Sequence, residues 1–108
     1  APKSSNKIYI IKSLDKKLCI DDIAKGKGLS PDELLAEMEE IVEKGTRLNL
    51  SHIILGMMEE DEREDIHDFF KETEEFSFDE ARVEFEEDEF SDEEIRLLRI
   101  DFISKVAN

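Results

Sequence analysis

The stretch IDDIAKGKGLSPDELLAEME, residues 20–39, decides the fold because it predicts two helices and the turn between them. Gly26 and Gly28 can adopt the positive backbone φ that ends a helix. Ser30, a proline and Glu33 then form the combination typical of a capping box, which marks the start of a second helix. This spacing predicts a helix-turn-helix. The same motif also occurs as a plain corner between two packed helices, and the sequence leaves both interpretations open.

Apolar residues recur at helical spacing on both sides of this motif. The run IYII, residues 8–11, is also compatible with a strand. Further Ser-x-x-Glu boxes begin at Ser77 and Ser91, and three such boxes in one short chain are typical of helical proteins. The expected helices cover about residues 5–16, 20–25, 31–44, 49–58 and 59–73, with two more behind Ser77 and Ser91.

We therefore expect an all-α fold, a helix-turn-helix-containing bundle of about six to seven helices with no substantial sheet. Residues 1–108 would form a single domain. Residues 5–45 would be its helix-turn-helix part, and residues 46–108 an acidic helical extension. Because the sequence begins with Ala1 rather than Met, we expect it to be a fragment of a longer protein.

The apolar stripes also predict which side chains form the core. In the first helix we expect Ile8, Ile11 and Leu14 to face inward. Cys19 is expected to be a small core residue, and Asn49 to cap a helix. The remaining residues expected inside include Ile23, Ala24, Leu29, Leu34, Leu35, Met38, Ile41, Val42, Ile54, Ile66, Phe70, Ile95, Leu98, Phe102 and Val106.

Charge is distributed unevenly along the chain, whose formal net charge is −15. Residues 1–29 contain seven Lys and three Asp, a net of +4, whereas residues 30–108 contain eight Lys or Arg and 27 acids, a net of −19. Affinity for DNA depends largely on neutralising phosphates. Only the first quarter of the chain therefore has the charge to face DNA favourably.

The sequence offers no combination of residues typical of catalysis. Its single cysteine excludes an internal disulfide and a cysteine-based zinc site, and fits a reducing compartment. His52 and His67 lack partners at metal-ligand spacing, and the acid-dense stretches lack the central glycine of a calcium loop. No phosphate-binding loop is present, and no apolar run is long enough to cross a membrane. We expect no catalytic residue, no metal and no cofactor in this fragment.

A family resemblance adds information about the parent protein. Residues 20–54 resemble the helix-turn-helix domain at the C-termini of helicases. Residues 60–108 resemble the C-terminal tail of RecQ-family ATP-dependent DNA helicases of the Bacteroidetes type. The matching portions are GTRLNL (45–50), DIHDFF (65–70) and SDEEIRLLRIDFIS (91–104).

The resemblance implies a parent that unwinds duplex DNA with ATP and Mg²⁺ in DNA repair and recombination. The motor lobes would lie upstream of this fragment. The parent would be a cytoplasmic, nucleoid-associated bacterial protein.

The second helix of the motif departs from a DNA-reading pattern, because it is acidic where such a helix should be neutral or basic. The resemblance transfers only Ser30, at the start of that helix. The cations within reach of phosphates are Lys12, Lys16, Lys17, Lys25, Lys27 and Arg47. The alternative for each is a solvated surface side chain.

Two functions follow from these observations. In the first, the fragment is an accessory domain of a RecQ-like helicase that touches the DNA backbone through residues 7–30. In the second, it is an acidic protein-interaction module that does not contact DNA. That module would bind a basic partner surface, either the DNA channel of the helicase core or a basic repair protein.

Overall fold

The computed structural model describes residues 3–73 and 77–106. Within these ranges the chain forms seven α-helices and one short 3-10 helix, with no strand. In chain order these are α1 (Lys3–Asp15), α2 (Ile20–Gly26), α3 (Pro31–Glu43), α4 (Ser51–Leu55), α5 (Glu60–Glu72), α6 (Phe78–Glu84), the 3-10 helix η1 (Glu86–Asp88) and α7 (Asp92–Val106). The expected all-α fold is therefore confirmed, and the IYII run belongs to α1.

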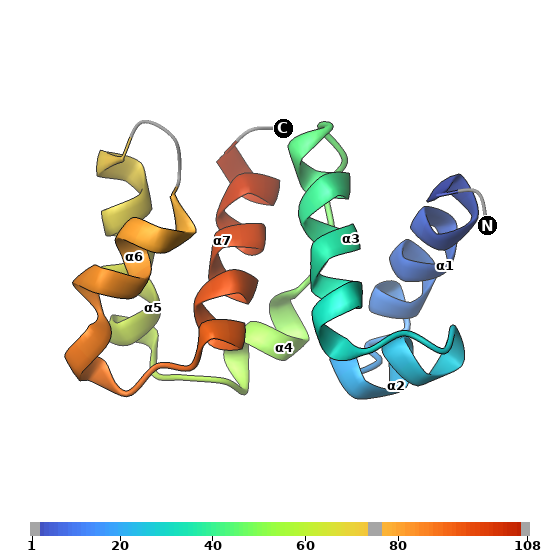
Figure 1. Ribbon diagram of the computed structural model, residues 1–108, viewed down its shortest axis with the longest axis horizontal. Helices are drawn as coiled ribbons and strands as arrows, with labels where there is room; N and C mark the ends of the chain where they lie inside the picture. The colour runs from blue at the N-terminus through green and yellow to red at the C-terminus, as the bar shows by residue number, and fades with distance from the viewer. Residues whose placement is uncertain (1–2, 74–76, 107–108) are drawn as a thin grey trace.

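The helices are arranged along one axis, with overall extents of 37 × 24 × 20 Å. Figure 1 shows α1 and α2 at one end and α5 and α6 at the other. Helices α3 and α7 lie side by side in the middle and share the most extensive helix–helix interface. One end of the long axis is thus built from the first two helices and the other from α5 and α6, while α7 returns to the middle.

The turn between α2 and α3 has the expected geometry at one glycine but not at the other. Gly28 has a φ of +66°, which glycine adopts without strain, and the amide of Leu29 bonds back to the Ala24 carbonyl at 2.9 Å. The expectation for Gly26 was wrong, because this residue is the last of α2. A Cβ atom there would lie 2.0 Å from the Tyr9 hydroxyl oxygen, so Gly26 allows α1 and α2 to approach closely.

The core is one contiguous cluster of apolar side chains. Helices α3 and α7 contribute half of its buried residues, at helical spacing, including Leu34, Met38, Ile95 and Leu98, which are at most 1% exposed. Since burial of such side chains is the main stabilising contribution to folding, the α3–α7 pair forms the centre of the domain.

Three residues expected inside lie at the surface instead. Ile8 is 55% exposed because α1, at the end of the row, has its core stripe at Ile10 and Leu14. A residue two positions earlier in a helix points about 200° away. Cys19 is exposed at the N-cap position of α2, just outside the helix. Val106 is the last residue of α7 and is 52% exposed.

The helix caps follow the sequence signals, except that only the serine half of the box at Ser77 forms and that one cap is shifted. Ser91 and Glu94 form a reciprocal box at 3.1 and 2.8 Å, and the Ser77 hydroxyl accepts the Glu80 amide at 3.2 Å. Asn49 was expected to cap the helix, but Leu50 holds the N-cap position of α4. Asn49 therefore lies one residue before the N-cap. Its side chain accepts a hydrogen bond from the Ser51 amide at 3.4 Å.

One carboxylate is buried within this fold. Asp101 on α7 is 2% exposed and lies 3.3 Å from the His67 ring and 3.1 Å from the Lys105 ammonium. Burial disfavours its ionisation, but the close contacts with His67 and Lys105 outweigh that effect and hold the pKa of the Asp101 carboxyl below its usual value. Asp101 thus links α7 to α5 through a charge-assisted contact.

Candidate nucleic-acid interface

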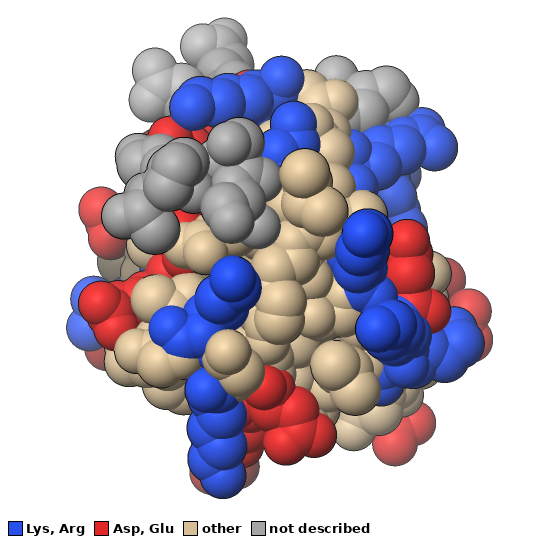
Figure 2. Space-filling view, turned by 90° about the vertical axis from the view of Figure 1, so that its right-hand side faces the viewer, with Lys and Arg blue, Asp and Glu red and all other residues tan. Residues whose placement is uncertain are grey.

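Five of the predicted lysines lie at the end of the molecule formed by α1 and α2. Lys12 is in the last turn of α1 and Lys25 in the last turn of α2. Lys16 and Lys17 follow α1, and Lys27 follows α2. All five side chains are exposed. Figure 2 looks onto this end and shows Lys and Arg side chains gathered around a central uncharged strip. We call this surface the α1–α2 end.

Tyr9 joins the two helices of this end. Its hydroxyl donates a hydrogen bond of 2.8 Å to the Ile23 carbonyl of α2. The Lys27 ammonium lies 5.1 Å from the centre of the Tyr9 ring, within the range of a cation–π contact. Lys27 is therefore held against α1, so that cations from two separate stretches of sequence share one surface.

Arg47 lies apart from the turn that carries Lys25 and Lys27. It follows α3 and lines a shallow hollow together with Ile11 and Asp15 of α1 and Lys105 of α7. A carboxylate beside Arg47 reduces the positive potential that it presents to a phosphate.

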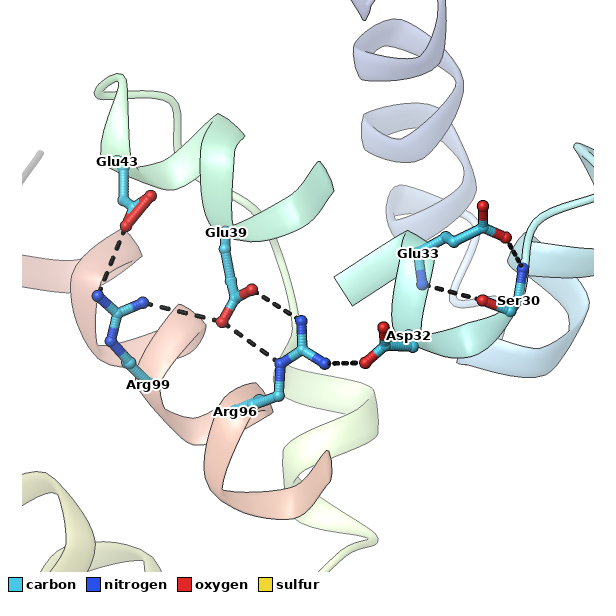
Figure 3. Close-up of polar contacts among 7 residues, drawn as sticks. All are labelled: Ser30, Asp32, Glu33, Glu39, Glu43, Arg96 and Arg99. Carbon is cyan, nitrogen blue, oxygen red and sulfur yellow. Dashed lines mark hydrogen bonds and ion pairs between the residues drawn. The ribbon is translucent and has the colours of Figure 1, made fainter. Parts of the chain in front are cut away.

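Ser30 uses its polar groups within the start of α3. Its hydroxyl accepts the Glu33 amide at 3.1 Å, and its own amide donates to the Glu33 carboxylate at 2.9 Å, so the expected capping box is confirmed (Figure 3). Asp32 adds a second carboxylate to this first turn. The start of α3 thus carries its own negative charge at the place where another protein of this architecture could hold an anion.

Helix α3 holds the position of the second helix of the motif but contains six carboxylates and no cation. On one side, the Asn6 side-chain amide of α1 donates to Glu37 at 2.8 Å. On the other side, α7 covers the helix along its length (Figure 1). Its flanks are therefore occupied by neighbouring helices, and its remaining surface is acidic.

Two arginines of α7 pair with these acids, as Figure 3 shows. Arg96 contacts Glu39 through two nitrogens, at 2.8 and 3.4 Å, and also binds Asp32. Arg99 lies 3.5 Å from Glu43 and 3.9 Å from Glu39. The hydrogen bond to Glu39 is the main reason why the pKa of the Arg96 guanidinium is raised. Burial opposes this effect, and the hydrogen bond to Asp32 adds a smaller contribution in the same direction as Glu39.

This ion-pair cluster was not predicted from the sequence. A signal was present: Arg96 and Arg99 are three residues apart on one helix, and Glu39 and Glu43 four apart on another, so each pair shares a face. Only the packing of α3 against α7 brings the two faces together.

Other binding chemistry is sparse in the part of the chain that the structure describes. No group of three or more His, Cys, Asp and Glu side chains is placed to hold a metal ion there. None of the described helices has the length and apolar character that crossing a membrane requires.

Comparison with known proteins gives a family match for the amino-terminal part of the chain. No curated protein matches the sequence. The family described as "RecQ-1-like, helix-turn-helix domain" matches residues 4–54. This range covers α1 to α4 except for Lys3, the first residue of α1, and Leu55, the last residue of α4. This match covers the acidic second helix and the lysines of the α1–α2 end. With an all-α fold and the capped turn in place, residues 4–54 are similar to the RecQ-1-like helix-turn-helix domain family, over slightly less than half of the chain.

Proposed function

We propose that the chain is a non-catalytic accessory domain of a RecQ-like ATP-dependent DNA helicase, and that its α1–α2 end contributes to DNA binding. The family match supports the parentage. The gathering of exposed lysines at one end of a molecule whose net charge is −15 carries the proposed DNA contact. The parent would use ATP and Mg²⁺ in its motor, and would act in repair and recombination as a cytoplasmic, nucleoid-associated protein.

The proposed contact is with phosphates rather than with base edges. Lys12, Lys16, Lys17, Lys25 and Lys27 can approach the backbone of a single strand or a duplex from one side. Helix α3 would not enter a groove, because α1 and α7 flank it and its six carboxylates would face the phosphates. The domain would therefore add affinity and orientation to the helicase without reading sequence.

Salt-dependent binding of the 108-residue chain to labelled single-stranded and forked DNA tests this proposal. We expect binding at about 50 mM salt that weakens steeply as salt is raised, because counterions are released from the phosphates. The double variant Lys25→Glu, Lys27→Glu should lose binding. As a control, Lys44→Glu combined with Lys71→Glu makes the same change of charge at two exposed lysines of α3's end and α5, and should retain it. Equal loss in both double variants would contradict the proposed surface.

The acidity of α3 supports a second candidate. In this alternative the domain binds a basic surface of the helicase core or of a repair protein and does not contact DNA. Absence of DNA binding at about 50 mM salt, together with capture of the purified helicase core, would favour it over the first candidate.

A further inference from the structure

A groove with apolar and acidic lining lies on α6, at the far end of the molecule from α1 and α2 (Figure 1). Val83 is at its centre and is 72% exposed, more than any other large apolar side chain in the described part of the chain. This residue lines two neighbouring hollows of about 360 and 500 Å³, one shared with η1 and α7 and the other with α5. We call the two hollows and Val83 together the Val83 groove.

The floor of the Val83 groove is built from phenylalanines whose rings meet edge to face or tilted. The Phe85 ring lies 5.6 Å from Phe69 and 6.0 Å from Phe90, measured between ring centres. Phe69 in turn contacts Phe70 of the core at 6.0 Å. Because these rings support one another from the core outward, the groove is a preformed apolar surface rather than an isolated exposed side chain.

The rim of the Val83 groove is strongly acidic. Residues 77–94 contain ten Asp or Glu and one Arg. Asp79, Glu80 and Glu84 line the hollows directly and are exposed, whereas the single Arg82 lies 3.5 Å from Asp92 and is offset by it. An apolar centre within an acidic rim is complementary to a helix that has one apolar face and basic flanks.

We propose that the Val83 groove binds a basic amphipathic helix of another protein, whose apolar side chains would cover Val83 and fill the hollows on either side. Its Lys and Arg side chains would pair with the acidic rim. A second copy of this chain is a poorer occupant, because two molecules of net charge −15 repel each other. The inference does not rest on DNA binding, since the α1–α2 end and the Val83 groove lie at opposite ends of the long axis.

Peptide binding to the full 108-residue chain tests the proposal. The probe is a labelled helical peptide of about 18 residues, with leucines on one face and Lys and Arg on the other, followed by fluorescence anisotropy. A scrambled peptide of the same composition controls for charge alone. Val83→Asp should weaken binding about tenfold or more, since it places a charge where the apolar contact is required. Leu55→Asp makes a comparable change at a residue that is 63% exposed and lines neither hollow, and should bind as the wild type does.

Each outcome decides for or against the Val83 groove. Loss confined to Val83→Asp, with weaker binding of the scrambled peptide, supports it. Equal binding of both peptides, equal affinity of both variants, or no binding would overturn it. Self-association of the chain that Val83→Asp abolishes would also overturn it, because a second copy would then be the occupant. The Lys25→Glu, Lys27→Glu variant should bind the peptide normally, so this proposal and the proposed DNA contact can fail separately.

Discussion

Arg96 on α7 and Glu39 on α3 form a two-point ion pair across the centre of the domain, with contacts of 2.8 and 3.4 Å. The Arg96 side chain is only 17% exposed and that of Glu39 only 21%, so the pair is largely withdrawn from water. Asp32, the second partner of Arg96, lies in the first turn of α3. The last helix of the chain thereby neutralises part of the acidic helix that a DNA-reading protein would place in a groove.

Replacement of Arg96 by methionine should lower the free energy of unfolding by about 1–3 kcal/mol. Methionine keeps an unbranched stem, so most of the loss should arise from the Glu39 carboxylate, which would keep only its 3.9 Å contact with Arg99, rather than from packing. Urea unfolding of both proteins at neutral pH measures the difference.

The matched control for Arg96→Met is Lys44→Met, which removes one cation from an exposed pair with Glu40 at 2.9 Å. Exposed pairs of this kind contribute little, and we expect a change of less than about 0.5 kcal/mol. If the two substitutions change the free energy of unfolding equally, net charge rather than the α3–α7 contact explains the result for Arg96.

Much of the fold was predictable because the sequence carries its helix boundaries locally. The boxes at Ser30 and Ser91 each mark a helix start within four residues, and both are observed. The side of α1 that faces the core was less predictable. Ile8 and Ile10 differ little in chemistry, and which of them is buried depends on where α3 packs.

In the candidate interface, too, the features set by neighbouring residues were predictable and those set by long-range packing were not. Lysines close in sequence were expected to share one end, since Lys12 to Lys27 span only two short helices and their turns. The contact of Arg96 with Glu39 joins residues 57 positions apart, and no local pattern determines such a pairing. Long-range helix packing therefore decides which acids of α3 pair with the arginines of α7.

Gly26→Ala should destabilise the protein by about 1–3 kcal/mol, although alanine normally stabilises a helix relative to glycine. The added Cβ would lie 2.0 Å from the Tyr9 hydroxyl oxygen, which its hydrogen bond to Ile23 holds in place. The α1–α2 contact would have to open. Thermal and urea unfolding measure the loss.

A double-mutant cycle with Tyr9→Phe assigns that loss to the hydroxyl. Removing the hydroxyl relieves the closest approach, so Gly26→Ala should cost less in the Tyr9→Phe background than in the wild type. Additive effects of the two substitutions would show that the hydroxyl is not the obstacle at Gly26.

Asp101→Asn should reduce the free energy of unfolding by about 1–3 kcal/mol at neutral pH, and this difference should disappear in acid. The pKa of the Asp101 carboxyl is lowered in the folded protein by His67 and Lys105, against the effect of burial. A carboxylate with a lowered folded pKa stabilises the protein fully above its unfolded pKa of about 3.9. That contribution is lost as the pH falls from there through the folded value. Urea unfolding of wild type and variant at several pH values between about 7 and 2 measures it, and comparing the two proteins cancels the titration of the surface acids. A difference that stays constant over this range would show that Asp101 acts through its shape and its neutral hydrogen bonds rather than through its charge.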